Sequence, residues 1–259
     1  MTAPLFWVSP EALASAGPGA VVQVAGEEAR HALAAQRLAV GEPVLVSDAV
    51  GSRAWGRIVA ARPGREPTFD VRLAGIEHVS PRLPELVLVQ ALAKQRRDED
   101  AVASATGLGV DRLIPWQAAR SVPRWDGAKA ERGRERWEQI VRAEGKVARR
   151  AWLPVVEPVT GAAALAARLE GEIAAGVAHG IVLHEEAARP LARRLAAAAG
   201  AARIYLVIGP EGSIAPGELA AFETAGAVTA RLGPEVLRTA LATAAALTLA
   251  CHVLGRWAE

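Results

Sequence analysis

The sequence has little cysteine and no recognisable export signal. Cys251 is the only cysteine among 259 residues, so an internal disulfide is excluded, and no group of cysteines and histidines has the spacing of a zinc site. Residues 1–10 lack the basic start and the long apolar core of a signal peptide. We therefore expect a chain without a metal site that resides in the reducing cytoplasm.

Long apolar runs are also missing. The longest weakly polar run, Thr239 to Leu254, contains His252 and falls short of the ~20 apolar residues needed to span a bilayer. We expect no membrane segment, and we interpret this Ala- and Thr-rich run as a buried helix.

The common nucleotide-binding and hydrolase motifs are absent. No Gly-x-Gly-x-x-Gly follows a predicted strand, and no Gly-x-x-x-x-Gly-Lys-Ser/Thr occurs, which removes the usual support for dinucleotide and nucleoside triphosphate binding. Neither Gly-x-Ser-x-Gly nor His-Glu-x-x-His is present, so serine hydrolase and zinc protease chemistry have no motif either.

Lysine is scarce, and the basic charge is carried mostly by arginine. The formal net charge is only +2, but the stretch from Arg120 to Arg150 contains ten Lys or Arg residues against five Asp or Glu. This stretch is a candidate anion-binding surface, and a solvated helical face is the alternative interpretation. Hydrophobic residues make up 51% of the chain, which is enough for a full core.

The first part of the chain, to about Val79, predicts a small β-barrel. Short β-type runs alternate with turn signals, and one helix interrupts them. The predicted strands are 21–24, 43–47, 54–60 and 68–73, and the predicted helix is 27–37. The segment Ser80-Pro81-Arg82-Leu83-Pro84 follows as a linker, because it has two prolines and no periodicity.

From Glu85 onwards, strands alternate with helices, which predicts a largely parallel sheet covered by helices. The predicted strands are 86–91, 112–115, 180–184, 203–208 and 228–232, and the predicted helices are 98–108, 131–148, 162–174, 188–198, 216–225 and 236–254.

Ligands of open α/β sheets bind beyond the carboxyl ends of the strands. Three predicted strands of the last third of the chain end in distinctive segments: 183–186 (Leu-His-Glu-Glu), 208–212 (Ile-Gly-Pro-Glu-Gly) and 232–238 (Leu-Gly-Pro-Glu-Val-Leu-Arg). Glycines there allow a ligand to approach the main chain, and prolines fix the loops. We expect a ligand site lined largely by backbone.

The second and third of these segments together resemble the ribosomal RNA small subunit methyltransferase E family, within the SPOUT superfamily of knotted methyltransferases. The resemblance covers nearly the whole chain. In the N-terminal part, His31, Arg37, Gly41 and the turn 48–51 match that family's PUA-like RNA-binding barrel. Further along, residues 90–94, 108–110, 120–122 and 149–154 fall where the family pattern has its equivalents.

The resemblance implies an α/β fold with a C-terminal trefoil knot at 80–259, preceded by a PUA-like β-barrel at 1–79. It implies S-adenosylmethionine as cofactor, and N3 of a uridine in the decoding-region helix of 16S rRNA, free or in the small ribosomal subunit, as target. It also implies a homodimer through the knot domain. By carry-over, the cofactor-binding residues are Leu183, His184, Ile208, Gly209, Pro210, Glu211, Gly212, Leu232, Gly233, Val236, Leu237, Arg238 and Thr239.

Methylation at N3 requires an exposed base that loses its N3 proton, so a cation near the uridine anion would assist. Arg238 is the first choice for this catalytic cation, with a purely structural role in closing its loop as the alternative, and Arg120 is the second choice. The resemblance further implies RNA contacts, mainly to phosphates, from six residues: His31, Arg37, Lys94, Arg120, Arg149 and Arg150.

Several positions depart from the family pattern. Ser213 replaces the second glycine of the Gly-Pro-Glu-Gly-Gly loop, and polar residues of the family are replaced at Gly107, Val147, Ala240 and Leu241. Two alternatives to an active uridine N3 methyltransferase therefore remain open. One is an RNA-binding or ribosome-assembly protein of the same fold with weakened catalysis, and the other is a related methyltransferase that acts on another RNA.

Overall fold

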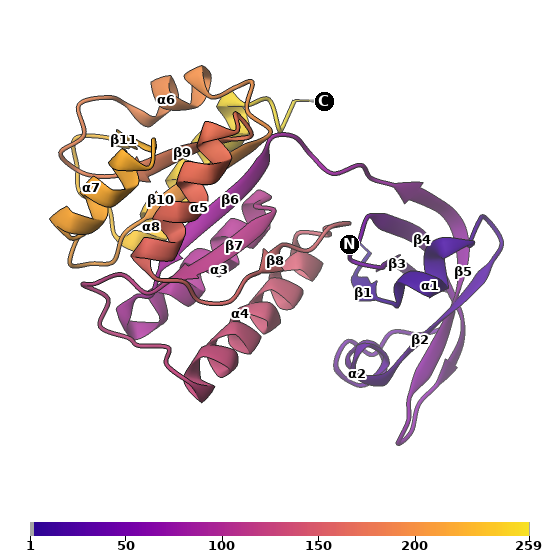
Figure 1. Cartoon of the computed structure of the whole chain (residues 1–259). Helices are drawn as coiled ribbons and strands as arrows, with labels where there is room; N and C mark the ends of the chain where they lie inside the picture. The colour runs from indigo at the N-terminus through magenta and orange to yellow at the C-terminus, as the bar shows by residue number, and fades with distance from the viewer. Residues whose placement is uncertain (1–2, 259) are drawn as a thin grey trace. The chain divides into compact units, whose positions relative to one another are not determined.

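The computed structural model describes residues 3–258 and divides the chain into two compact units (Figure 1). Unit 1 contains the residues up to Pro81 together with Gly145–Leu153, and unit 2 contains Arg82–Glu144 and the residues from Pro154 onwards. The chain therefore leaves the second unit once to complete the first. No sequence pattern indicated this exchange.

Unit 1 is built on a five-stranded sheet of order β1-β3-β4-β5-β2, in which the β1–β3 pair is parallel and the other pairs are antiparallel. Alternating apolar residues point to one side, where the rings of Phe6 and Phe69 meet edge to face at 5.3 Å. The strands are β1 (Leu5–Trp7), β2 (Val21–Ala25), β3 (Pro43–Ser47), β4 (Ser52–Arg62) and β5 (Thr68–His78).

The helical segments of unit 1 are short: α1 (Pro10–Ala14), α2 (Gly26–Arg30) and the π-helix η1 (His31–Ala35). The single helix predicted over 27–37 is thus an α-helical turn that continues into a π-helix, and it ends before Arg37, which has a left-handed φ of 56°.

The segment Gly145–Leu153 is fixed in unit 1 by backbone and side-chain bonds. The indole Nε1 of Trp152 donates to the carbonyl of Val79 at 2.7 Å, and the Leu153 amide donates to the carbonyl of Ala49 at 3.0 Å. Gly51, with a φ of 119°, has no room for a side chain, because an added Cβ would lie 2.6 Å from the ring of Trp152.

Unit 2 contains a six-stranded, entirely parallel sheet of order β11-β9-β10-β6-β7-β8. The predicted parallel α/β architecture is confirmed. The strands are β6 (Glu85–Ala91), β7 (Arg112–Trp116), β8 (Val155–Val156), β9 (Ala178–Leu183), β10 (Arg203–Ile208) and β11 (Val228–Ala230). The helices are η2 (Lys94–Arg96), α3 (Arg97–Leu108), α4 (Ala128–Val147), α5 (Ala162–Ala174), α6 (Leu191–Ala197), α7 (Pro216–Thr224) and α8 (Thr239–Val253).

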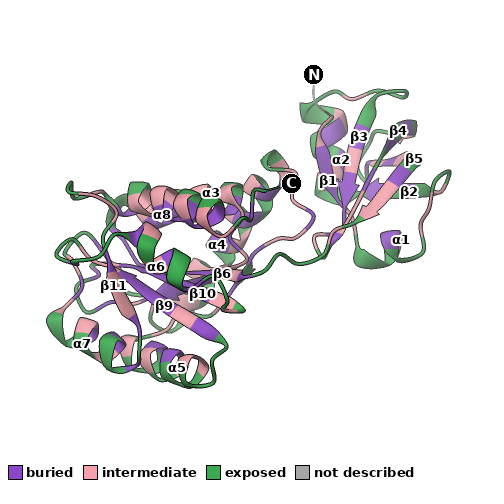
Figure 2. Cartoon of the chain, turned by 90° about the horizontal axis from the view of Figure 1, so that it is seen from above, coloured by how far each residue is buried: buried purple, intermediate pink, exposed green. Residues whose placement is uncertain are grey.

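Helices cover both faces of this sheet (Figure 2). Helices α3 and α8 pack against each other on one face, and α5 and α7 cover the other. The central strands are buried on both sides and consist of continuous apolar runs such as Leu86–Val89, as expected for a parallel sheet. Within residues 3–258, no helix is both long and apolar enough to cross a membrane.

The amino ends of the central strands carry a closed ring of ion pairs. Each of three carboxylates contacts two guanidinium groups, at distances from 2.6 to 3.1 Å. In order around the ring, the residues are Glu85, Arg112, Glu157, Arg168, Glu172 and Arg203. Burial opposes ionisation of Glu85, but hydrogen bonds from Arg112 and Arg203 outweigh it and lower the pKa of this carboxyl.

Candidate functional site

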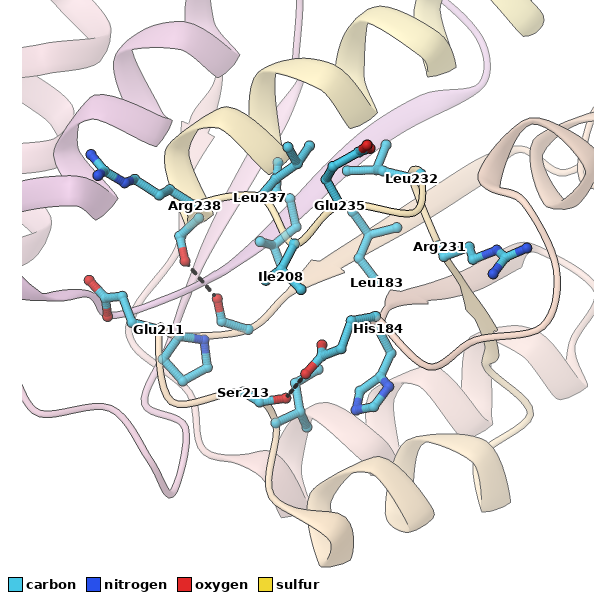
Figure 3. Close-up of a pocket in the computed structure, with 18 of the residues that line it drawn as sticks. Leu183, His184, Ile208, Glu211, Ser213, Arg231, Leu232, Glu235, Leu237 and Arg238 are labelled. Carbon is cyan, nitrogen blue, oxygen red and sulfur yellow. Dashed lines mark hydrogen bonds between the residues drawn. The ribbon is translucent and has the colours of Figure 1, made fainter.

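A pocket of about 310 Å³ lies at the opposite end of the sheet, where β9, β10 and β11 reach their carboxyl ends. These strands are neighbours in the sheet, so the three loops that follow them meet around one cavity (Figure 3). Parts of the segments 183–185, 208–214 and 230–239 line it, together with Arg97 and Ala242.

The structure brings together twelve of the thirteen residues predicted to bind the cofactor. Gly212 is the exception, because it does not line the pocket; its carbonyl instead accepts a hydrogen bond from Nη1 of Arg120 at 3.0 Å. The twelve that line the cavity are Leu183, His184, Ile208, Gly209, Pro210, Glu211, Leu232, Gly233, Val236, Leu237, Arg238 and Thr239.

Gly209 lies in the loop after β10 and packs closely against Ile214 of the same loop. A Cβ added there would lie 2.7 Å from Cγ1 of Ile214, so any side chain would push the loop apart. The carbonyl of Gly209 accepts a hydrogen bond of 3.1 Å from the hydroxyl of Thr239, the first residue of α8. This bond fastens the start of α8 to the loop.

Helix α8 begins later than the sequence predicted. The predicted helix began at residue 236, whereas the observed helix begins at Thr239 and has Arg238 as its N-cap. Residues 236–238 are therefore extended loop that lines the pocket, and Val236 is 78% exposed. Hydrophobic periodicity could not reveal this, because an exposed valine in a pocket loop has the same sequence appearance as a helical one.

Ser213 occupies a left-handed conformation, with a φ of 61°. Glycine adopts this conformation at little cost, which explains why the family pattern has glycine at this position. The Ser213 hydroxyl donates to Oε1 of Glu185 at 3.0 Å and so joins the loops after β9 and β10 (Figure 3). Glu185 and Ser213 both line the pocket. Glu185 belongs to the predicted segment 183–186, but neither residue was among the predicted cofactor-binding residues.

The loop after β6 is connected to the pocket by Glu211, a residue of the loop after β10. The carboxylate of Glu211 accepts the backbone N–H of Lys94 at 3.1 Å and pairs with Nη1 of Arg97 at 3.3 Å. Two successive residues of this loop, Gln95 and Arg96, have left-handed φ values of 53° and 62°. Sequence reasoning missed Arg97, because contacts over more than a hundred residues leave no local pattern.

Asp98 follows directly in α3 and is buried. Burial raises the pKa of its carboxyl to about 6, although the backbone N–H groups of Glu99, Asp98 and Ala93 lower it in part. The Asp98 carboxylate therefore connects the loop at Ala93 to the start of α3, although burial disfavours its charged form.

The two predicted catalytic arginines are exposed at the site. Arg238 lines the pocket, and its side chain extends outwards on the side opposite to Arg231 (Figure 3). Arg120 follows β7 and contacts the pocket loop at Gly212. The carboxylate of Glu218 holds the loop after β7 in place. It accepts one hydrogen bond from the backbone N–H of Ala119 at 2.8 Å and another from that of Ala215 at 3.3 Å.

The six residues predicted to contact RNA are distributed over both units. His31, Arg37, Arg149 and Arg150 belong to unit 1, and Lys94 and Arg120 belong to unit 2. The Nε of Arg150 donates to the carbonyl of Trp152 at 2.7 Å, so this side chain also has a structural task.

Part of the basic charge between residues 120 and 150 is neutralised locally. Arg134 pairs with Glu131 and Glu138 on α4, and Arg136 pairs with Glu99. This part of the stretch is a solvated, ion-paired helical face, which was the alternative interpretation of the sequence.

Four of the five departures from the family pattern lie outside the residues that line the pocket. Gly107 is exposed on α3, Val147 ends α4, and Ala240 and Leu241 lie in the first turn of α8. Of the five, only Ser213 lines the cavity.

The pocket combines apolar surface with both acidic and basic side chains. Apolar surface comes from Leu183, Ile208 and Leu237. The charged side chains are those of Glu185, Glu211, Glu235, Arg97, Arg231 and Arg238. Among the described residues, no group of three or more His, Cys, Asp or Glu could hold a metal ion. The cavity suits an organic ligand that carries both apolar and charged parts.

Comparison with known proteins agrees with this architecture. The family model described as RNA methyltransferase domain matches residues 81–251, which include all the residues that line the pocket. The fold, the site and this match define an RNA methyltransferase.

Over 239 residues, the chain is 44% identical to ribosomal RNA small subunit methyltransferase E of Mycobacterium bovis, covering 92% of this chain and 89% of that protein. It is 25% identical over 225 residues to the protein of the same name from Bacillus subtilis, covering 87% of each. The chain belongs to the ribosomal RNA small subunit methyltransferase E family.

A solved structure has the same fold. It is the crystal structure of a ribosomal RNA small subunit methyltransferase E from Neisseria gonorrhoeae bound to S-adenosyl methionine. It superposes with a TM-score of 0.81 at 20% identity, over 97% of this chain and 98% of the other.

Proposed function

We propose that this protein is an S-adenosylmethionine-dependent methyltransferase that methylates N3 of a uridine in the decoding-region helix of 16S rRNA. The observation that carries the proposal is the pocket formed by the loops after β9, β10 and β11 in a chain of this family. The Neisseria relative of the same fold is bound to S-adenosyl methionine.

The residues present fit that cofactor. Its adenine ring has apolar faces, its sulfonium and ammonium groups are positive, and its carboxylate is negative, which matches a cavity that offers apolar surface together with acidic and basic side chains. The absence of a side chain at Gly209 lets a ligand approach the main chain. The twelve predicted residues that line the pocket would hold the cofactor, together with Glu185 and Ser213.

The protein's own task is mainly to position the uridine and to stabilise the charge that develops on it. When bound, the cofactor supplies an electrophilic methyl group on sulfur. Arg238 extends from the pocket and would stabilise the negative charge that forms when the uridine N3 loses its proton. Arg120, which is held against Gly212, would contact the RNA beside it.

Further parts of the proposal concern the assembly. We assign a PUA-like role to unit 1 and a trefoil knot to the loops around the pocket, and we expect RNA contacts from His31, Arg37, Lys94, Arg149 and Arg150. A homodimer would pack through α8, whose small side chains allow close approach and whose first turn exposes 57% of Leu241.

Mapping of rRNA methylation tests this function directly. Ribosomal RNA from cells with and without the gene is analysed by mass spectrometry, and the purified protein is assayed on unmethylated small subunits with labelled cofactor. We expect a 3-methyluridine in the decoding region that disappears with the gene and is restored in vitro. An unchanged decoding-region uridine would exclude this target.

Variants of the two arginines at opposite sides of the pocket test the catalytic assignment. Arg238→Ala should reduce kcat by about 10², because the lost interaction stabilises charge that is absent from the ground state. Cofactor affinity should change much less, because we expect Arg238 to contact the cofactor through its main chain, which the substitution keeps. Arg231→Ala is the matched control and should retain kcat. Equal losses in both variants would contradict a catalytic role for Arg238.

A further inference from the structure

The outer face of the sheet in unit 1 carries an exposed tryptophan. Trp55 on β4 is 45% exposed, although tryptophan side chains are usually buried. It lies directly opposite Gly75 on β5, and a Cβ added at Gly75 would collide with its indole ring. The ring therefore lies against bare backbone on one side, while a large part of it faces solvent.

The pairing of β4 with β5 has two register shifts close to this ring. The register shifts between Trp55 and Gly56 and again between Ile58 and Ala60. Between the shifts, burial alternates along β4, so that Trp55 and Arg57 point outwards and Gly56 is buried. In the strand register, Arg57 lies directly opposite Arg72 of β5, which is also exposed.

Two arginines directly opposite each other on one sheet face repel, at a cost in stability. The same two strands avoid this cost elsewhere, because Arg53 pairs with Glu77 at 2.6 Å and Arg62 pairs with Asp70 at 2.7 Å. Within residues 3–258, neither Arg57 nor Arg72 forms a salt bridge. Nη1 of Arg57 donates to the carbonyl of Gly41 at 2.7 Å, which fixes the position of this guanidinium.

We propose that Trp55, Arg57 and Arg72, together called the Trp55 face, bind a single-stranded segment of the RNA substrate. An unpaired base would stack on the indole, and the adjacent phosphates would contact the two guanidiniums. Base stacking on aromatic rings beside a positively charged track is how sheet surfaces bind single strands without reading sequence. The proposal rests on the proposed function, because it assumes an RNA substrate.

The charge of the face favours RNA over a protein partner. Two guanidiniums side by side need anions at close spacing, which a phosphate backbone provides along its length. A paired duplex is a poor fit, since its bases are stacked internally and cannot reach the indole. None of the three residues is among those expected to contact RNA from the family resemblance, so the face is an additional contact.

Three variants of the full-length protein, each compared with the parent and with two control variants, test the Trp55 face. Trp55→Leu keeps an apolar cover over Gly75 but removes the aromatic ring, and Trp55→Phe keeps a ring. Arg72→Ala removes one phosphate contact, and Arg65→Ala, at the exposed tip between β4 and β5, is its matched control. Trp257→Leu, a second exposed tryptophan, is the control for Trp55. The probe is a labelled 16S rRNA fragment with unpaired flanks, measured by fluorescence anisotropy at several salt concentrations.

We expect Trp55→Leu to weaken RNA binding about tenfold, and Trp55→Phe to stay within about threefold of the parent. Arg72→Ala should reduce the slope of log K against log salt by about 1, while Arg65→Ala and Trp257→Leu leave binding unchanged. Calorimetric titration with S-adenosylmethionine should give the same affinity for all variants.

Three results would overturn the proposal. The first is unchanged RNA binding by a folded Trp55→Leu protein, and the second is an unchanged salt slope for Arg72→Ala, which decides the matter even if the Trp55 variants unfold. The third, measured with assembled small subunits as a second probe, is a Trp55→Leu protein that loses binding to the subunit but keeps binding to the naked fragment, which would assign the face to a ribosomal protein. Failure of the proposed function is distinguishable, because then the parent protein itself would not methylate the decoding-region uridine, whereas failure of the Trp55 face alone leaves that activity of the parent protein intact.

Discussion

The two ends of the parallel sheet in unit 2 are built in opposite ways. At the amino ends, six charged residues close a ring in which every carboxylate has two cationic partners. At the carboxyl ends, loops rich in glycine and proline surround a cavity, and Arg231 and Arg238 extend outwards (Figure 3). One end of the sheet is neutralised, and the other is left open for a ligand.

Two carboxylates, one at the start of β6 and one in the helix that follows it, illustrate this difference. Glu85, at the start of β6, has a lowered pKa because two arginines contact it. Asp98, beyond the end of β6, has a pKa raised to about 6 because it is buried without a cationic partner to compensate. The first charge stabilises the fold, and the second destabilises it directly beside Arg97, which lines the pocket. Such a cost is typical of functional sites.

The largest expected effect is on the pH dependence of stability at Asp98. The unfolded chain releases this proton near the ordinary pKa of 3.8, and the folded chain releases it near 6. The contribution of Asp98 to stability therefore falls as the pH rises from 4 to 6, by about 3 kcal/mol in total, and stays low at higher pH. Asp98→Asn should remove this fall and raise the free energy of unfolding at pH 8. Urea unfolding at several pH values measures it, with the exposed Asp100→Asn as control.

The ring at the amino ends can be opened by Arg203→Met. This change leaves Glu85 and Glu172 with one arginine each, and we expect a loss of about 2 kcal/mol, less than for fully buried pairs because the ring is partly exposed. Thermal unfolding measures the loss, and the exposed Arg193→Met is the control. Cofactor affinity should not change; a parallel loss of affinity would contradict the separation of the two ends.

The open end is tested by Gly209→Ala. The added methyl group meets Ile214 at 2.7 Å, so the loop must shift, and we expect at least a tenfold loss of cofactor affinity, about 1.4 kcal/mol. Gly217→Ala in α7 meets nothing within 4 Å and should bind the cofactor as the parent does. Calorimetric titration compares the two, and equal affinities would show that the Gly209 loop does not contact the ligand.

The smallest effect is expected at Ser213. Ser213→Ala keeps the left-handed strain and loses the bond to Glu185, and should cost about 1 kcal/mol. Ser213→Gly loses the same bond but relieves the strain, and should change the free energy of unfolding by no more than about 0.5 kcal/mol. Equal destabilisation by both changes would show that the backbone at this position is not strained.

Local patterns predicted most of the framework of unit 2. The strand over 203–208 and the helix over 162–174 have the predicted bounds, because both are continuous, strongly patterned segments. The pocket loops were located by their glycines and prolines at strand ends, and twelve of the thirteen predicted residues do line one cavity. Their role in binding the cofactor remains a prediction.

The features that the sequence could not reveal depend on distant contacts. The ring of ion pairs joins residues up to 118 positions apart, and the bond between Ser213 and Glu185 joins two loops. The two-residue strand β8 is too short to leave a pattern. Residues 145–153 belong to unit 1 because they pack around Trp152. The sequence could not reveal this, because the first of these residues continue the helical pattern of α4.

A crystal structure of the protein grown with S-adenosylmethionine tests the central claim most directly. The account predicts the cofactor in the cavity between the loops after β9, β10 and β11, within hydrogen-bonding distance of the main chain near Gly209 and Leu232, with its methyl group on the side of Arg238. Cofactor bound anywhere else on the molecule, or a cavity that stays closed at saturating concentration, would contradict it.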